Sequence, residues 1–529
     1  MRRFKDALLM AYAKRWLFLI HRWLGIFACI FFVMWFISGI VMMYVGYPKL
    51  TAAERIQHLP PLNAAAITLT PRQALDAAGI KGPLQELRLA VASGGRAVYL
   101  AVPARDLNVG LASGRRRMAP GSGTVVIDAS TGVVLRQVDR AHVLASAAVF
   151  GGSAVATDYG GIIDEDAFTH SRALDAHRPL HKVRLADADA TLLYVSSTTG
   201  EVVRDAPRIE RLWNYVGAWI HWLYPFRGNM FNAYWTDIVI WLSILGIGLA
   251  LTGATVGIMR WRFTRVYKRG SHSPYHGFVM RWHHILGLLF ALATLTWIFS
   301  GLMSMNPWKI FDSGAPALNT VAMNGGPLNI SSQQASPQQL LAAAPDGVRE
   351  LHWIRASGQT LVLANISGSA RPTVFNAESA NVYVPDFEVL KTNIARLLPD
   401  PIARIDVLTD YDLYYYSREP HTMTGGSEKF LPVWRVVFDN AHATWVHIDP
   451  ATGAVLGHTD STKRLSRWLF AMLHSWDWLP LLERRPLWDI VLISLSLCGT
   501  ALSLSGVVIG WRRLGRKFRS VRVRRFARL

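Results

Sequence analysis

Four long apolar stretches constrain this chain more than any other feature, at residues 16–45, 235–259, 278–305 and 487–509. A helix needs about 20 mainly apolar residues to cross the hydrocarbon core of a bilayer, and each stretch is long enough. The first stretch follows a basic N-terminus, but the apolar core of a secretory signal peptide has only about 7–15 residues and precedes a small-residue cleavage site. We therefore predict an integral membrane protein whose first span is retained as an anchor.

The net charge of the chain, +20, gathers beside these stretches. Residues 2–15, 260–281 and 512–528 together hold 20 of the 56 lysines and arginines and a single acid, Asp6. Basic loops remain in the cytoplasm under the positive-inside rule, so these segments and both termini are predicted to be cytoplasmic. The charge therefore indicates membrane topology and contact with lipid, and we expect no nucleic-acid partner.

The two long polar segments, 46–209 and 307–463, are then predicted to face the periplasm of a Gram-negative bacterium, with the chain in the inner membrane. Two shorter apolar segments, 212–226 and 465–482, contain prolines and are interrupted by Trp, His and Asp. If these two segments crossed the membrane, the parity of the crossings would place the basic loop at 260–281 outside. We therefore predict two interfacial helices on the outer side, with their tryptophans at headgroup level.

An internal duplication relates the two halves of the chain. At an offset of 253, Arg211-Leu212 and His221 reappear as Arg464-Leu465 and His474; at an offset of 262, His21 and Ser38-Gly39 reappear as His283 and Ser300-Gly301. Both copies begin in the cytoplasm, so the repeats are predicted to be parallel, with a pseudo-twofold axis along the membrane normal. The predicted fold class is an α-helical integral membrane protein with α+β external domains. It has four transmembrane helices in two parallel repeats, each with an external domain and an interfacial helix.

The predicted boundaries follow this organisation. They are 1–45 for the cytoplasmic N-terminus and first helix, 46–209 for the first external domain, 210–262 for an interfacial helix and the second transmembrane helix, 263–306 for the cytoplasmic loop and third helix, 307–463 for the second external domain, and 464–529 for the other interfacial helix, the fourth transmembrane helix and a basic tail. Short external helices are predicted to begin at Thr70-Pro71 and Ser336-Pro337, and strands are predicted at 84–89, 97–102 and 125–127. No glycine-rich phosphate loop occurs, so nucleotide chemistry is not expected.

Five of the 17 histidines lie in or beside the apolar stretches: His21, His283, His284, His221 and His474. An ionisable side chain in a membrane segment is costly and indicates function, although one alone can be a structural hydrogen-bond partner. The duplication places one histidine of each half near the cytoplasmic face and another near the outer face. Two symmetry-related imidazoles can bind both axial positions of a b-type haem without covalent attachment. We predict two non-covalent b-type haems, one between His21 and His283 and one between His221 and His474.

Other metal and redox chemistry has less support. Zinc and copper remain alternatives, but no Cys, Asp or Glu accompanies these histidines at ligand spacing. The two cysteines, Cys29 and Cys498, lie in apolar stretches and form neither a CxxC pair nor a CxxCH haem attachment site. The histidines of the external segments show no ligand spacing and are predicted to be solvated residues.

Two neighbours of the predicted ligands leave alternatives open. Consecutive helical residues point about 100° apart, so only one of His283 and His284 can face a shared haem. The repeat aligns His284 with Arg22, which favours His283 as the ligand. Arg22 is a candidate partner for a haem propionate, and Arg15 or Arg281 are alternatives.

These features together resemble the PepSY-associated transmembrane family, which includes inner-membrane ferrisiderophore reductases of Gram-negative bacteria. The resemblance covers nearly the whole chain and rests on a small set of motifs. They are His21-Arg22-Trp23-Leu24-Gly25, Arg281-Trp282-His283-His284-Ile285-Leu286-Gly287, Ser197-Thr198-Thr199-Gly200-Glu201-Val202, Asp449-Pro450-Ala451-Thr452-Gly453-Ala454-Val455 and the outer helices bearing His221 and His474.

The resemblance implies PepSY-like external domains and a di-haem protein that reduces the Fe(III) of a siderophore or other chelate in the periplasm. Iron then leaves as Fe(II), for which hard-oxygen siderophores have little affinity. We expect Trp219, Trp222, Trp476 and Trp478 to shield the outer haem. The sequence contains no nicotinamide or flavin motif, so the electron donor is expected to be external, either membrane quinol or a soluble cytoplasmic reductase.

Two other classes of function remain as alternatives. In one, the membrane helices anchor the external domains, which bind a periplasmic protein without redox activity. In the other, the chain is a permease, which the sequence disfavours because the four spans contain no intramembrane acids and no broken-helix pair.

Overall fold

The computed structural model describes residues 2–104, 123–152, 155–227, 230–422, 425–426 and 429–526. The chain divides into two compact units. The helical unit comprises Met1–Gly46, Trp213–Ser313 and Thr462–Leu529, and the sheet unit comprises Tyr47–Leu212 and Gly314–Ser461. Each unit is therefore assembled from segments that are distant in the sequence.

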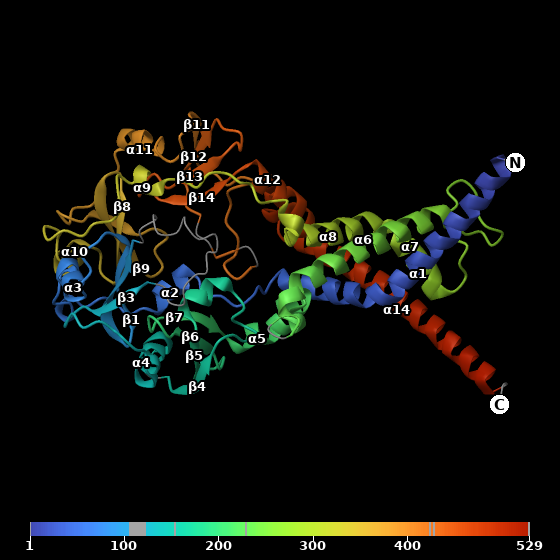
Figure 1. Ribbon diagram of the computed structural model, residues 1–529, viewed down its shortest axis with the longest axis horizontal. Helices are drawn as coiled ribbons and strands as arrows, with labels where there is room; N and C mark the ends of the chain where they lie inside the picture. The colour runs from blue at the N-terminus through green and yellow to red at the C-terminus, as the bar shows by residue number, and fades with distance from the viewer. Residues whose placement is uncertain are drawn as a thin grey trace. The chain divides into compact units, whose positions relative to one another are not determined.

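The helical unit is a bundle of long apolar helices (Figure 1). They are α1 (Arg2–Met42), α6 (Trp235–Arg260), α7 (Phe278–Leu289), α8 (Ala291–Ser304) and α14 (Leu487–Phe526). Within the described residues, three stretches are long and apolar enough to cross a membrane by themselves: Leu9–Met42, Asn232–Arg260 and Leu487–Lys517. These correspond to the first, second and fourth predicted spans. The start of α1 and the end of α14 lie at the same end of this unit (Figure 1).

The third predicted span is broken into two helices. The α7 and α8 helices are bent by 67°, because Phe290 leaves the helical region of the backbone (φ −106°, ψ 10°). The pair counts as a fourth crossing only if the two helices form one span. No proline lies between residues 278 and 305 to signal a kink. The expectation that the spans contain no broken-helix pair is therefore wrong.

The two predicted interfacial segments fold as short, irregular helices. The first contains the end of α5 (Arg208–Asn214), a π-helix η4 (Tyr215–Trp219) and the 3₁₀ turns η5 (Tyr224–Phe226) and η6 (Asn232–Tyr234). The second contains the end of α12 (Ser461–Arg467), a π-helix η8 (Trp468–Met472) and α13 (Leu479–Leu482). A further 3₁₀ turn, η7 (Pro307–Lys309), follows α8.

The sheet unit contains three antiparallel sheets (Figure 1). The six-stranded sheet has the order β10 (Thr373–Asn376), β9 (Gln359–Ile366), β8 (Val348–Ala356), β1 (Leu84–Ser93), β2 (Arg96–Pro103) and β3 (Val125–Asp128). A four-stranded sheet has the order β4 (Thr157–Ile163), β5 (Leu180–Leu185), β6 (Leu192–Ser196) and β7 (Val202–Ala206). The other has the order β11 (Ile402–Leu408), β12 (Val433–Phe438), β13 (Trp445–Ile448) and β14 (Val455–Thr459).

The six-stranded sheet joins the two polar segments that the sequence treats as separate domains. Strand β1 of the first segment pairs with β8 of the second, and Leu87 lies opposite Trp353 and Ala90 opposite Glu350. Leu87 and Trp353 are both fully buried in the largest core of this unit. The two segments therefore share one sheet and one core.

Short helices complete the sheet unit. They are α2 (Ala52–His58), η1 (Ala64–Ala66), α3 (Pro71–Ala77), α4 (Arg140–Gly151), η3 (Arg172–His177), α9 (Thr320–Met323), α10 (Pro337–Ala343) and α11 (Phe387–Ile394). The predicted helix starts at Thr70 and Ser336 are confirmed, and in each the hydroxyl and a glutamine three residues later form a capping box. The predicted strands at 84–89, 97–102 and 125–127 are confirmed as parts of β1, β2 and β3.

Candidate functional site

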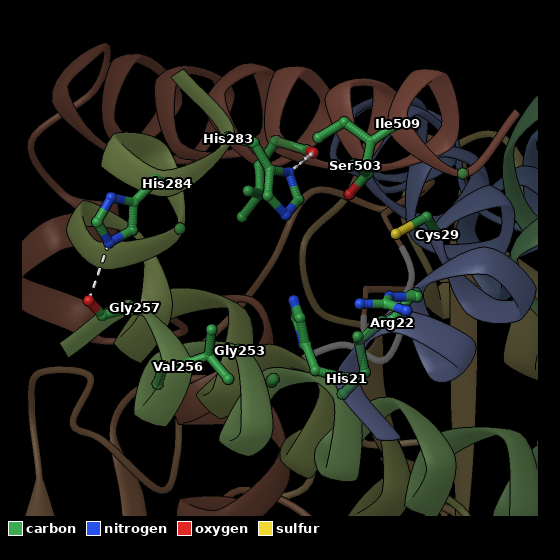
Figure 2. A pocket seen from close by; sticks show the side chains of 18 of the residues that line it. His21, Arg22, Cys29, Gly253, Val256, Gly257, His283, His284, Ser503 and Ile509 are labelled. Carbon is green, nitrogen blue, oxygen red and sulfur yellow. Dashed lines mark hydrogen bonds between the residues drawn. The ribbon is translucent and has the colours of Figure 1, made fainter. Parts of the chain in front are cut away.

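The first pair of predicted ligands lies across a cavity in the helical unit. His21 on α1 and His283 on α7 have ring centres 6.5 Å apart, and the two rings point toward each other (Figure 2). The cavity has a volume of about 390 Å³ and is lined by residues of α1, α6, α7, α8 and α14. Cofactor and small-molecule sites span about 300–1,000 Å³. The structure therefore brings His21 and His283 together at a cavity of suitable size.

A hydroxyl group fixes each of these two rings. The Nδ1 atom of His21 lies 3.4 Å from Thr252 Oγ1, and that of His283 lies 2.8 Å from Ser505 Oγ. Each hydroxyl donates its own hydrogen to a backbone carbonyl of the preceding turn, at 2.7 Å and 2.6 Å respectively. The hydroxyl oxygen must therefore accept a hydrogen from Nδ1, which leaves the lone pair of each imidazole on Nε2.

The second pair of predicted ligands has the same arrangement. His221 and His474 have ring centres 6.0 Å apart. Their Nδ1 atoms lie 2.9 Å from Ser38 Oγ on α1 and 3.0 Å from Ser300 Oγ on α8. These serines also donate to backbone carbonyls of their own helices, at 2.7 Å and 2.9 Å. Nε2 is again the atom that keeps the lone pair.

Each histidine of the second pair follows a π-helical segment at the same distance. His221 comes two residues after Tyr215–Trp219, and His474 comes two residues after Trp468–Met472. A π-turn inserts an extra residue into a helix and is frequent at functional sites. The sequence predicts two interfacial helices but not these π-helical segments, which turn both rings toward the bundle.

A glycine follows the hydroxyl residue at all four rings. The pairs are Ser38-Gly39, Thr252-Gly253, Ser300-Gly301 and Ser505-Gly506. A Cβ atom on Gly253 would lie 2.8 Å from Cε1 of His21, and one on Gly506 would lie 3.4 Å from Cε1 of His283. These two glycines thus give the imidazoles of His21 and His283 room to approach α6 and α14. Sequence reasoning missed Thr252 and Ser505, although a hydroxyl residue before glycine in each apolar stretch is the signal that marks them.

His284 does not join the pair formed by His21 and His283. Its Nε2 lies 2.9 Å from the carbonyl oxygen of Gly257, and its Nδ1 lies 2.8 Å from Ser273 Oγ. The ring packs edge-on against Tyr275 and Trp261 of the loop between α6 and α7. Figure 2 shows it directed toward Gly257 rather than His21. Both nitrogens are thus engaged, Nε2 with α6 and Nδ1 with the loop.

Comparison with protein families adds an independent observation. The model of the PepSY-associated TM region, PepSY_TM, matches residues 18–381, which is more than two thirds of the chain. The chain belongs to the PepSY-associated transmembrane family. No curated protein matches it. The matched region includes His21, His221 and His283, while His474 lies beyond its end.

Other predicted site residues of this PepSY-associated membrane protein are placed less directly. Arg22 lines the cavity beside His21 (Figure 2). Trp476 and Trp478 stack on each other with ring centres 6.2 Å apart, and Trp219 packs on Tyr215. The shielding role of these tryptophans and of Trp222 stays a prediction.

Two aromatic residues outside the predicted set contact His221 and His474 directly. The Nε1 group of Trp35 donates to the backbone carbonyl of His221 at 3.0 Å, and the ring of Phe470 lies 5.6 Å from that of His474. Trp35 belongs to α1, so this hydrogen bond links the segment that carries His221 to α1.

Proposed function

We propose that this PepSY-associated membrane protein binds two non-covalent b-type haems and carries electrons across the bacterial inner membrane to reduce a ferric siderophore or other ferric chelate in the periplasm. The observation that carries the proposal is the pair of facing imidazole couples, His21 with His283 and His221 with His474. A metal–imidazole bond is about 2 Å long, so two imidazoles on opposite sides of one metal have ring centres about 6 Å apart. The observed separations are 6.5 Å and 6.0 Å.

The surroundings of each couple favour haem over a bare metal ion. Among the described residues, no group of three or more His, Cys, Asp or Glu side chains could hold a metal. Two imidazoles alone make a poor zinc site, whereas a macrocycle supplies four further ligands to iron. At the first couple, a cavity lined mainly by apolar side chains and glycines, with space beside both rings, fits a planar group.

The proposed topology has four spans in two parallel repeats, with α7 and α8 as one bent span and both termini in the cytoplasm. The concentration of basic residues in 2–15, 260–281 and 512–528 supports this orientation. The first histidine couple then lies near the cytoplasmic face, the second lies near the outer face, and the sheet unit is periplasmic.

The residues of the chain have separate tasks in this function. Haem iron takes up and releases one electron at a time. The four histidines would hold the iron through Nε2, and the hydroxyls of Thr252, Ser505, Ser38 and Ser300 would keep the rings oriented. The apolar helices exclude water from the inner site. A quinol or a soluble reductase supplies each electron, and one electron converts the Fe(III) of the chelate to Fe(II), which hard-oxygen chelators hold weakly.

The first test is the visible spectrum of the full-length protein purified from haem-sufficient cells. We expect a dithionite-reduced spectrum with split bands from two bis-imidazole haems, and reoxidation on addition of a ferric chelate with release of Fe(II) to a ferrous-specific dye. A protein reoxidised by oxygen but not by ferric chelates would limit the proposal to electron transfer. A colourless preparation would contradict the proposal and would favour an anchor that presents the sheet unit to a protein partner.

A second test concerns the hydroxyl that orients an outer ligand. In Ser300→Ala protein, His474 loses the hydroxyl that accepts its Nδ1 hydrogen, so we expect the outer haem to bind about 10–100-fold more weakly. The measurement is the rate of haem transfer to apomyoglobin. Ser304→Ala is the matched control, because Ser304 is exposed on the same helix and its hydroxyl donates to the backbone carbonyl of Gly301. Equal transfer rates in the two variants would contradict the proposed role of Ser300.

A further inference from the structure

Helices α6 and α14 present the same series of residues to the inner cavity. Each series begins with a leucine. A hydroxyl residue follows three positions later, glycines follow four and eight positions later, and an arginine follows eleven positions later. The series are Leu249, Thr252, Gly253, Gly257 and Arg260 on α6 and Leu502, Ser505, Gly506, Gly510 and Arg513 on α14. These spacings keep all five positions on one helix face. The hydroxyls bind the histidine rings, and the other four residues of each series line the cavity.

The function proposed above uses the hydroxyls and glycines but not the terminal arginines. Arg260 and Arg513 line the same cavity as Arg22, and no aspartate or glutamate is among its lining residues. Arg22 and Arg513 are close enough to interact unfavourably as like charges. The guanidinium of Arg260 lies 4.8 Å above the ring of Phe18, which leaves its edge free to donate hydrogen bonds. The cavity therefore has an excess of positive charge that an anionic occupant would balance.

The position of this charge defines one edge of the cavity. Arg260 is the last residue of α6 and lies over the ring of Phe18 on α1, and Arg513 lies beyond the apolar part of α14. Both side chains are exposed, unlike the histidine rings. The cavity thus has an apolar interior and a cationic mouth with one arginine from each of two helices.

We infer that Arg260 and Arg513 bind the two carboxylates of the planar group held between His21 and His283, so that the acidic edge of this group faces the cavity mouth. The inference rests on the proposed haem function and adds to it the orientation of the inner group and two residues that hold it. Guanidinium groups suit this task because they donate paired hydrogen bonds to a carboxylate. Equivalent positions in the two series supply one arginine for each carboxylate, and Arg22, beside His21, is a third cation in the cavity lining.

The test is a spectroelectrochemical titration of full-length protein in nanodiscs, comparing the wild type with Arg260→Gln, Arg513→Gln and the double variant. Loss of a nearby positive charge destabilises the reduced state of the haem. The midpoint potential of one haem should therefore become more negative in each single variant and more negative still in the double variant. Loss of a charge-assisted hydrogen bond should also weaken binding of that haem about tenfold or more. The other haem should keep its potential and thereby report that the variants are folded.

Arg512→Gln is the matched control, because Arg512 is exposed and adjacent to Arg513 but does not line the cavity. It removes the same charge and should leave both potentials unchanged. Equal shifts in Arg512→Gln and Arg513→Gln would overturn the inference, since the effect would then come from general surface charge. Unchanged potentials and haem retention in the double variant would overturn it while leaving the proposed two-haem function intact.

A lipid headgroup is the other source of an anion at this mouth. The titration is therefore run in nanodiscs of phosphatidylcholine alone and in nanodiscs that also contain phosphatidylglycerol. Shifts of equal size in both lipids support binding to the carboxylates of the inner group. Shifts confined to phosphatidylglycerol would assign the arginines to lipid phosphates and overturn the inference. A wild-type protein without haem would overturn both this inference and the function on which it rests.

Discussion

Under the proposed function, His283→Ala protein is expected to lose about half of its bound haem and to keep the spectrum of the other haem, because His283 supplies one of the two imidazoles that would hold the inner haem. His21 remains, but a single imidazole leaves one axial position without a protein ligand. The measurement is the haem-to-protein ratio together with the reduced spectrum of the purified chain. External imidazole should restore a bis-imidazole spectrum, since the truncated side chain leaves room for a free ligand.

His284→Ala is the control for this prediction, since it removes the neighbouring imidazole from the same helix. Its ring bonds to Gly257 and Ser273 instead of facing His21. We therefore expect both haems to be retained and the loop between α6 and α7 to become more sensitive to protease. Loss of the inner haem in His284→Ala together with its retention in His283→Ala would reverse the assignment of the ligand.

The largest expected effect on stability comes from Glu350 in the sheet unit. Its side chain is only 2% exposed and binds Arg55 through two hydrogen bonds of 2.7 Å and 3.0 Å and Arg88 through one of 3.2 Å. Glu350→Gln keeps the volume but removes the buried carboxylate that pairs with Arg55, while Arg88 keeps its ion pairs with Glu86 and Glu201. Breaking a buried ion pair from one side costs about 3–5 kcal/mol, so the free energy of unfolding should fall by about that amount. Urea titration of the full-length protein with pulse proteolysis of the sheet unit measures it.

Glu388→Gln provides the comparison on the surface. Glu388 is 82% exposed and pairs with Lys391 three residues later, and such pairs contribute less than about 1 kcal/mol. Similar losses in the two variants would contradict the importance of burial at Glu350.

The same ion pair gives the sheet unit a dependence on pH. Burial alone would raise the pKa of Glu350, but the charges of Arg55 and Arg88 hold this pKa below its ordinary value. The contribution to stability is therefore complete above the unfolded-state pKa of about 4.3 and is lost as the pH falls through the lower pKa of the folded state. Glu350→Gln should flatten the acid side of the stability profile.

The pairing of the histidines could be predicted because the duplication places equivalent residues at two levels of the bundle. The structure places His21 near His283 and His221 near His474, as that reasoning requires. The identity of the hydroxyls that orient the rings could not be predicted in the same way. Serine and threonine in apolar helices commonly bond to their own backbone, and only the fold reveals that Thr252 and Ser505 also accept from an imidazole.

Other features depend on contacts between distant segments. Alternation of apolar residues is enough to predict strands at 84–89 and 97–102, because that pattern is local. The partner of a strand edge is not a local property, so the pairing of Leu87 with Trp353 has no sequence signal. The bend at Phe290 escapes prediction for a similar reason, since no proline marks it and packing decides where an apolar stretch breaks.

The pairing of β1 with β8 also has a consequence for biogenesis. When β1 leaves the ribosome its neighbour β2 follows at once, but β8 is synthesised only after α6, α7 and α8 have been made. During that interval β1 is an open sheet edge. Glu86 and Arg88 give this edge a pair of opposite charges, and charged side chains discourage association of such an edge with other chains. We therefore expect these charges to limit association of the nascent first half until the second half completes the sheet.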